Sequence, residues 1–464
     1  MEFENGVNRL SNELELLQKS DARKRLEILF DNGEFTEIDR FAKSNGDSCG
    51  VVTAYGYICG MYAYAFSQDI SDNNGAMSVA QAKKIKKVYE LAEKTGAPII
   101  GIFDSNGAMV TEGINVLNAY GDLIKIANNI SGVVPQISVI AGCCIGSAAV
   151  LAAQADIVIM AKDAELCVTS ASVLGDKTSE IGSAELNEKN GIAALIADSA
   201  NEAVEKAVNV LSLLPSNNLS LPIITEYVPS KSASYDTVDN IIDSIIDSES
   251  FVELFKNAAC CVNIGFARIG GTSVGIVATN SSKNDGLLCG KGATKIARFV
   301  RLCDAFSIPV ITLLDSHGIM GTAKSELSGD VKAVAMLTHA YSEATVAKIT
   351  VITGKAYGCS FTSMAGTGAN IDFAFAWPNA VISALPPMTA VQFMYKDRLA
   401  ETSREDLENE YCLTEASPFK AAADGNIDDV ISPEETVAKI LNALEVLASK
   451  RVSTLNKKHS NIQL

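Results

Sequence analysis

The chain has 464 residues, more than one hydrophobic core ordinarily organises, so two domains are expected. A net charge of −17 and an isoelectric point near 4.7 argue against a nucleic-acid-binding surface, because binding phosphates needs a clustered positive field. No stretch approaches 18 uninterrupted apolar residues and the N-terminus has no apolar signal core, so neither a membrane-spanning helix nor a secretory signal is predicted. The eleven cysteines include no Cys-x-x-Cys spacing, which excludes the common zinc motifs and favours reduced thiols in a cytoplasmic protein.

The first half of the chain predicts helices and strands in alternation. Apolar residues at helical spacing predict a helix over 11–30, which Asp-Asn-Gly then ends. Small and large apolar residues alternate over 50–69, as they do in β-strands. Residues 82–113 predict a helix that leads into a strand, and 135–150 predict a strand that ends in a glycine turn.

The second half repeats these three segments in the same order. Residues 263–282 match the β pattern, 293–324 match the helix and strand, and 347–362 match the strand and glycine turn. In both copies a proline precedes an apolar strand that ends in Asp-Ser-x-Gly, and equivalent residues lie at a nearly constant offset. The pattern indicates an internal duplication at the scale of a domain, not a short solenoid repeat.

A connector rich in proline and serine is predicted over 213–240, between the two copies. We therefore expect an N-terminal domain over 1–245 and a C-terminal domain over 246–464. The chain closes with a predicted helix that Ser432 caps and for which Glu435 completes a capping box.

The two glycine turns are candidate catalytic features. A strand that ends in glycine and leads into a helix presents unpaired backbone N–H groups, which bind an oxygen that becomes anionic during a reaction. In the first copy we expect these donors at Gly146 and Ser147, and in the second at Cys359 and Ser360, after Gly358. The alternative is that the small residues only permit close packing of helix against strand.

A second pair of turns, "DSNGAM" and "DSHGIM", also follows predicted strands. Asp104 and Asp315 either act as acids or, as is commoner at strand ends, cap the next helix. His317 is a general-base residue type, but Asn106 takes its place in the first copy. The chain has no GxxxxGK[ST] loop or GxSxG elbow, and Cys359 has no nearby sequence partner for a nucleophilic role. The sequence therefore favours catalysis by backbone donors.

Three stretches carry a resemblance to a known family: "GAPIIGIFDSNGAMVTEGI" (96–114), "ARFVRLCDAFSIPVIT" (297–312) and "SEATVAKITVITGKAYG" (342–358). From about residue 22 to 450 the chain resembles the carboxyltransferase subunits of biotin-dependent acyl-CoA carboxylases and decarboxylases. The resemblance implies an α/β fold of two tandem crotonase-like domains, each a β-β-α spiral. It also implies a hexamer built as a trimer of dimers, with each active site between the N-terminal domain of one subunit and the C-terminal domain of another.

The same resemblance implies the reaction and its residues. A carboxyl group would pass between protein-bound carboxybiotin and a short-chain acyl-CoA, similar to propionyl-CoA or methylmalonyl-CoA, through a thioester enolate. The glycine turn of the N-terminal domain would hold the thioester oxygen, and that of the C-terminal domain the ureido oxygen of biotin. Acyl-CoA binding is implied for Gly75, Gly107, Ala108 and Gly142, and biotin binding for Gly318 and Gly358.

Biotin would arrive on a separate protein, because the sequence has no Ala-Met-Lys-Met biotinylation site and no ATP-grasp-like extension. The implied partners are a biotin carboxyl carrier protein and either a biotin carboxylase or membrane decarboxylase subunits. Neither a metal nor a nucleic acid is implied. A decarboxylase complex is slightly favoured, since the chain is short and divergent for the family.

The chain departs from the family pattern beside each expected site. Ser147 stands where the family usually has glycine, and Cys359-Ser360 stands where it has Gly-Ala. Met109 stands where it has arginine, and Thr362 where it has an aspartate linked to acyl-chain choice. Two alternatives therefore stay open: a biotin-independent acyl-CoA enzyme of the crotonase type, and a catalytically silent assembly subunit.

Overall fold

The computed structural model has two compact units, Met1–Ser220 and Leu221–Leu464. Ile224 forms a β-bridge with Thr272, so residues that precede position 245 make contacts within the second unit. The structure describes residues 6–11, 14, 20–44, 47–175, 180–230 and 234–462.

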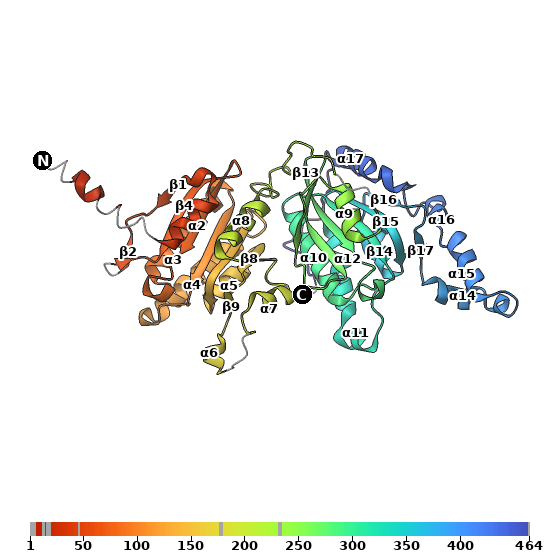
Figure 1. Cartoon of the computed structure of the whole chain (residues 1–464), viewed down its shortest axis with the longest axis horizontal. Coiled ribbons are helices and arrows are strands. Elements are labelled where there is room, and N and C mark those ends of the chain that lie inside the picture. Colours follow the sequence, from red (N-terminus) through yellow and green to blue (C-terminus); the bar gives the residue numbers. More distant parts are fainter. Residues whose placement is uncertain are drawn as a thin grey trace. The chain divides into compact units, whose positions relative to one another are not determined.

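The first unit is built on an eight-stranded mixed sheet with the order β1-β4-β5-β6-β7-β8-β10 (Figure 1). The pairings of β4 with β1 and with β5 are antiparallel, and the remaining pairings are parallel. A tight turn joins β4 to β5 through Cys59 and Gly60, which both have positive φ, as a two-residue hairpin turn requires. The strands are β1 (Phe35–Ile38), β4 (Val51–Ile58), β5 (Met61–Gln68), β6 (Ile99–Ser105), β7 (Gln136–Ile145), β8 (Ile157–Ala161), β9 (Glu165–Cys167) and β10 (Leu195–Ala197).

The second unit repeats this sheet with the order β11-β12-β13-β14-β15-β16-β18. Its hairpin turn lies at Gly270 and Gly271, again with positive φ. In each unit one three-residue strand lies off the main order: β9 pairs with the end of β7, and β17 with the end of β15. The strands are β11 (Val252–Leu254), β12 (Val262–Ile269), β13 (Thr272–Thr279), β14 (Val310–Ser316), β15 (Lys348–Tyr357), β16 (Phe373–Ala376), β17 (Val381–Ser383) and β18 (Asp429–Val430).

Helices connect the parallel strands of each sheet, and each unit has its own apolar core. A short pair of strands, β2 (Lys43–Ser44) and β3 (Asp47–Ser48), lies apart from the main sheet. The helices of the first unit include α2 (Asp21–Leu29), α3 (Val79–Thr95), α4 (Ile114–Asn129), α5 (Ser147–Ala153), α6 (Ala171–Leu174), α7 (Ala184–Lys189) and α8 (Ala200–Leu211). Those of the second include α9 (Val238–Ile245), α10 (Gly290–Ala305), α11 (Ala323–Ser328), α12 (Asp330–Glu343), α13 (Cys359–Met364), α14 (Pro387–Met394), α15 (Arg404–Leu413), α16 (Pro418–Ala423) and α17 (Thr436–Leu447).

Side-chain caps begin α2 and the last helical segment of the chain. Ser20 caps α2 by accepting a hydrogen bond from the Arg23 amide. Part of the helix expected over 11–30 lies outside the described residues. The capping box of Ser432 and Glu435 is confirmed, in a 3-10 turn that leads into α17.

Buried lysines confirm the duplication at the level of single contacts. Lys84 of α3 donates to the Val51 carbonyl at 2.8 Å, where β4 begins. Lys295 of α10 donates to the Val262 carbonyl at 2.7 Å, where β12 begins. Both amines are buried, and each satisfies a carbonyl at the equivalent point of its sheet. The two units therefore share internal polar packing as well as strand order.

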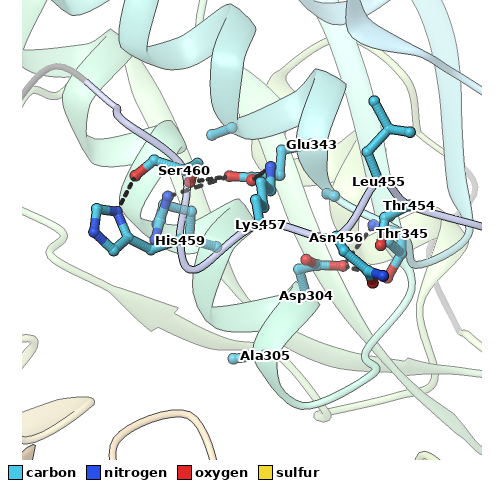
Figure 2. A pocket seen from close by; sticks show the side chains of 13 residues that line it. Asp304, Ala305, Glu343, Thr345, Thr454, Leu455, Asn456, Lys457, His459 and Ser460 are labelled. Atoms are coloured by element: carbon cyan, nitrogen blue, oxygen red, sulfur yellow. Dashed lines mark hydrogen bonds and ion pairs between the residues drawn. The ribbon is translucent and has the colours of Figure 1, made fainter.

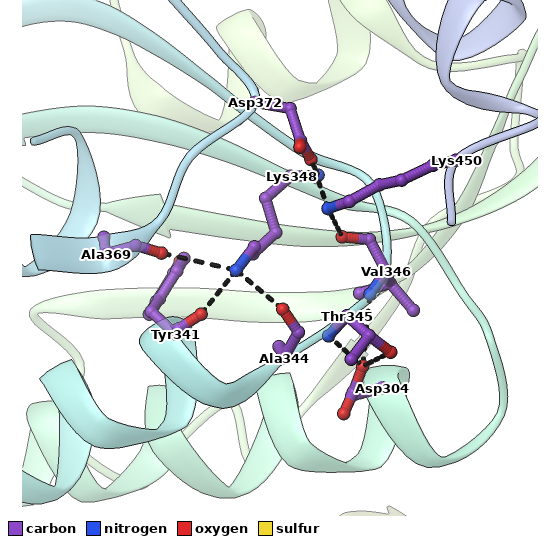
Figure 3. A network of polar contacts seen from close by, with 9 residues as sticks. All are labelled: Asp304, Tyr341, Ala344, Thr345, Val346, Lys348, Ala369, Asp372 and Lys450. Atoms are coloured by element: carbon purple, nitrogen blue, oxygen red, sulfur yellow. Dashed lines mark hydrogen bonds and ion pairs between the residues drawn. The ribbon is translucent and has the colours of Figure 1, made fainter. Parts of the chain in front are cut away.

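Lys348 stands at the start of β15 with its side chain fully buried (Figure 3). Its ammonium donates to the carbonyls of Tyr341 and Ala344 at the end of α12, the latter at 2.8 Å, and to that of Ala369 at 3.3 Å. Burial lowers the pKa of this amine to about 8. The first unit places Gln136 at the equivalent position.

Candidate active site

The two glycine turns have matching backbone geometry. Gly146 directly follows β7 with φ 70° and ψ −131°, and Gly358 directly follows β15 with φ 53° and ψ −124°. Residues with a Cβ rarely adopt this conformation, which explains the glycine in both copies. The Gly146 amide donates to the Cys167 carbonyl at 3.1 Å, and the Gly358 amide donates to the Ser383 carbonyl at 2.9 Å. The short strands β9 and β17 therefore hold the two turns in the same way.

These bonds correct one expectation about the backbone donors. The Gly146 amide is engaged with β9, so it is not available to a substrate oxygen. The first intrahelical bond of α5 runs from the Val150 amide to the Gly146 carbonyl at 3.3 Å, which leaves the amides of 147–149 before it. The first intrahelical bond of α13 likewise runs from the Thr362 amide to the Gly358 carbonyl, at 3.2 Å. The expected donors Ser147, Cys359 and Ser360 all lie in these first turns, where the backbone amides precede the first intrahelical hydrogen bond.

The space beside the two turns differs. A Cβ on Gly146 would meet no heavy atom within 4 Å, whereas one on Gly358 would lie 3.1 Å from the Ala384 carbonyl oxygen. Cys359 is exposed. The Ser360 hydroxyl is fully buried and lies 2.9 Å from the Ser316 hydroxyl. The first turn thus faces open space, while the second is supported from inside the fold by a serine pair.

Gly142 was expected to contact acyl-CoA, and the structure gives it a packing contact. A Cβ there would lie 2.3 Å from a carboxylate oxygen of Asp104. Gly354 of the second unit stands in the same relation to Asp315, also at 2.3 Å. Each glycine therefore makes room for the aspartate of the neighbouring strand.

The capping role expected for the two aspartates is wrong. Asp104 is 3% exposed and pairs with the Arg25 guanidinium at 2.9 Å. Asp315 accepts a hydrogen bond from the Lys355 amide at 2.7 Å. Each carboxylate instead packs against a glycine of the neighbouring strand, and the helical turns that follow begin at Met109 and Thr322. The Asp104–Arg25 pair spans residues far apart in sequence, and no local pattern predicts it.

The second pair of turns lies directly beside the glycine turns. A Cβ on Gly107 would be 3.2 Å from the Ile145 carbonyl oxygen, and one on Gly318 would be 3.8 Å from the Tyr357 carbonyl oxygen. Ile145 and Tyr357 are the last residues before Gly146 and Gly358. The expected residues Gly107 and Gly318 are therefore brought next to the turns, and both have the positive φ that favours glycine.

Equivalent β-bridges fix the position of these loops. Ala108 pairs with Met77, and Ile319 pairs with Leu288. Gly75, expected at the acyl-CoA site, lies against the backbone of the same strand end, since a Cβ there would be 2.9 Å from the Asp104 carbonyl oxygen. Of the residues expected in the first site, Ser147 directly follows the turn and Gly107 lies beside it, with Ala108 next in the chain. Gly75 and Gly142 pack against Asp104 instead.

The environment near the turns favours the neutral forms of one histidine and two cysteines. Burial and the nearby Lys355 ammonium lower the pKa of His317, so the imidazole is neutral at pH 7. Burial and a hydrogen bond to Glu165 raise the pKa of Cys167 to about 12. The Cys143 thiol has its pKa raised as well, mainly by burial. Neutral side chains at these three positions are compatible with the backbone amides acting as polarising groups of the turns.

A family model for the carboxyl transferase domain matches residues 18–462 of the chain. The chain belongs to the carboxyl transferase family. The carboxyltransferase is 36% identical to the methylmalonyl-CoA decarboxylase α subunit of Veillonella parvula, over 96% of this chain and 93% of that one. It is 37% identical to the mitochondrial propionyl-CoA carboxylase β chain of Sus scrofa, over 96% and 88% of the two chains.

The solved structures agree with this assignment. One chain of the transcarboxylase 12S hexamer, solved with methylmalonyl-CoA and methylmalonic acid bound, superposes on this chain with a TM-score of 0.93 at 33% identity, over 99% of both chains. The expected α/β fold of two duplicated crotonase-like domains is confirmed. None of the helices in the described part of the chain combines the length and apolar character that crossing a membrane requires.

A separate pocket of about 500 Å³ lies in the second unit, under the C-terminal segment (Figure 2). Glu343 stands at its centre and accepts hydrogen bonds from Lys457 and, at 2.7 Å, from the Ser460 hydroxyl. None of the residues expected at the active site lines this pocket. Glu343 forms an ion pair with Lys457, and Asp304 accepts hydrogen bonds from Thr345, so we assign the pocket no part in the reaction.

Proposed function

We propose that this carboxyltransferase moves a carboxyl group between biotin on a separate carrier protein and a short-chain acyl-CoA of the propionyl-CoA or methylmalonyl-CoA type. One observation carries the proposal: each unit ends an equivalent strand in a glycine turn whose following amides precede the first intrahelical bond. Two reactants that exchange a group each have an oxygen to polarise, and the duplication supplies one turn for each. The names of the relatives support this reactant class.

We assign the acyl-CoA to the first unit. The Ser147 amide, with the amides that follow it in α5, would donate to the thioester oxygen. That oxygen gains negative charge when the α-proton leaves, and donors aimed at it contribute about 2.7–4 kcal/mol each to transition-state stabilisation. The open face of Gly146 gives the thioester access, while Gly107 and Ala108 form the adjacent wall.

We assign biotin to the second unit. The amides of Cys359 and Ser360 would donate to its ureido oxygen, beside Gly318 and Gly358. When bound, biotin supplies the nitrogen that carries the carboxyl group. The Ser360–Ser316 hydroxyl pair holds the start of α13 in place, so the amides need little reorganisation to meet a charged oxygen.

The assembly and partners complete the proposal. The transcarboxylase 12S relative is a hexamer, and we propose a hexamer here as well, built as a trimer of dimers with each site shared between two subunits. A biotin carboxyl carrier protein would deliver biotin, and a biotin carboxylase or membrane decarboxylase subunits would complete the cycle. We place the enzyme in the cytoplasm, where its eleven cysteines would stay reduced.

An assay of carboxyl transfer tests the proposal. The purified protein is given methylmalonyl-CoA or malonyl-CoA with free biotin, and the decarboxylated acyl-CoA is measured by chromatography. Biotin-dependent product formation supports the proposal. Acyl-CoA turnover without biotin would instead indicate a crotonase-type enzyme, and no turnover by folded protein with any short-chain acyl-CoA would indicate a silent assembly subunit.

A further inference from the structure

Two cysteines of the second unit lie in contact beside the expected biotin loop. The sulfurs of Cys261 and Cys289 are 3.5 Å apart. Cys261 directly precedes the start of β12 and is 6% exposed, while Cys289 caps α10 and is half-buried. The Cys289 sulfur accepts the Gly292 amide at 3.4 Å. In the first unit Ser78 occupies the equivalent cap and accepts the Gln81 amide at 3.1 Å.

The two thiols are electrostatically unequal. The hydrogen bond from Cys261 lowers the pKa of Cys289 to about 6, and the amides of Gly292 and Lys291 act in the same direction, against burial and the Asp330 carboxylate. The same contact, together with burial, raises the pKa of Cys261. Because the Gly292 amide donates to the Cys289 sulfur, these contacts favour the nucleophilic thiolate at Cys289, with the Cys261 thiol in place to resolve an oxidised partner.

Cys289 is linked through the backbone to the loop that contains Gly318. Its neighbour Leu288 donates its amide to the Gly318 carbonyl at 2.9 Å and accepts the Met320 amide at 2.9 Å. A disulfide would bring the sulfurs from 3.5 Å to about 2.05 Å. The Cys289 sulfur would then leave the Gly292 amide, and the strain would reach Leu288, one residue away.

We propose that Cys261 and Cys289 form a reversible oxidation site for peroxides, and that their disulfide slows carboxyl transfer by displacing the loop at Gly318. The Cys289 thiolate attacks the peroxide and becomes a sulfenic acid, while hydroxide leaves. The Cys261 sulfur then attacks the sulfenic sulfur, and the sulfenic oxygen leaves as water after taking the thiol proton. In sum, one thiolate, one thiol and one hydrogen peroxide give one disulfide, one water and one hydroxide, which takes a proton from solvent to become the second water.

Mass spectrometry tests the disulfide on the full-length protein treated with hydrogen peroxide. A tryptic cross-link between the peptide holding Cys260 and Cys261 and the peptide holding Cys289 is expected, and dithiothreitol removes it. Cys260→Ser is the matched control, because Cys260 shares that peptide and is exposed. The cross-link survives in Cys260→Ser and is lost in Cys261→Ala. Cross-links through Cys260 alone, or none, would overturn the site.

Two further measurements test the coupling to the loop. Oxidation is expected to speed hydrogen exchange at the amides of Leu288 and Met320. It also slows transfer roughly tenfold or more, since a displacement of about 1 Å can cost a hundredfold in rate. Cys289→Ser, which restores the serine cap of the first unit, keeps its activity under peroxide. A disulfide that changes neither exchange nor rate would overturn the coupling.

The activity readout rests on the proposed function, whereas the cross-link and the hydrogen exchange do not. Reduced protein without transferase activity would count against the proposed function alone. The oxidation site and its effect on the loop would still be decided by the other two measurements.

Discussion

Replacing Gly146 by valine tests the central geometric claim about the first glycine turn. A Cβ at this position meets nothing within 4 Å, so the side chain projects into the space proposed for the thioester instead of into the core. The positive φ of 70° adds backbone strain of about 1–3 kcal/mol. For a unit of this size, each kcal/mol lowers the melting temperature by about 2–4 °C. The variant is thus expected to fold.

The expected loss of activity is much larger than the loss of stability. Keeping the thioester oxygen away from even one backbone donor costs about 2.7–4 kcal/mol, which is a hundredfold to a thousandfold in kcat. The assay is methylmalonyl-CoA decarboxylation in the presence of biotin, with thermal unfolding followed on the same samples.

Gly113 supplies a matched control for this experiment. It also precedes a helix, has φ 60° and ψ −136°, and leaves its Cβ position free of atoms within 4 Å. Gly113→Val therefore carries similar strain without blocking the turn and should keep most of the activity. Wild-type kcat/KM in Gly146→Val would refute the placement of the thioester. Equal losses in both variants would show that backbone strain, and not position, explains the effect.

Three other variants or measurements probe the structure around the sites. Arg25→Met leaves the buried Asp104 carboxylate without its cation and should lower the free energy of unfolding by about 3–5 kcal/mol in urea titrations. If adding Asp104→Asn to this variant restores none of the lost stability, the unpaired carboxylate does not explain the loss. Lys348→Met should be about 1–3 kcal/mol less stable than Lys348→Gln, because only glutamine can still donate to the carbonyls at the end of α12; equal melting temperatures would contradict this. The rate of Cys289 alkylation by iodoacetamide should rise as the pH increases through about 6 and level off near neutrality, since the thiolate forms above its lowered pKa. A rate that rises only near the usual thiol pKa would contradict the hydrogen bonds to the Cys289 sulfur.

The duplication could be predicted from sequence because its signals are local. Alternating apolar residues, a proline before a strand and a glycine after one each report on a few neighbouring positions, and the structure repeats β4–β7 as β12–β15 as expected. The capping box at Ser432 is equally local and was predicted correctly. The candidate turns at Gly146 and Gly358 were found for the same reason, since a glycine directly after an apolar strand is a local signal of a backbone turn that favours glycine.

The working details of the turns depend on contacts between distant segments. The strands β9 and β17 are three residues long, too short for a periodic signal, yet β9 takes up the Gly146 amide that the sequence offered as a donor. Asp104 looked like a helix cap until the fold brought Arg25 to it across 79 residues. Gly142 is glycine because that carboxylate packs against it.

The sequence by itself therefore determined the family, the internal duplication and the positions of the glycine turns, because these follow from short-range preferences of the chain. Only the tertiary structure decided which amides stay unpaired, which glycines face open space, and that Cys261 meets Cys289. Hydrogen-bond partners and close approach are properties of segments that meet only after the sheet has formed, and no local pattern encodes them.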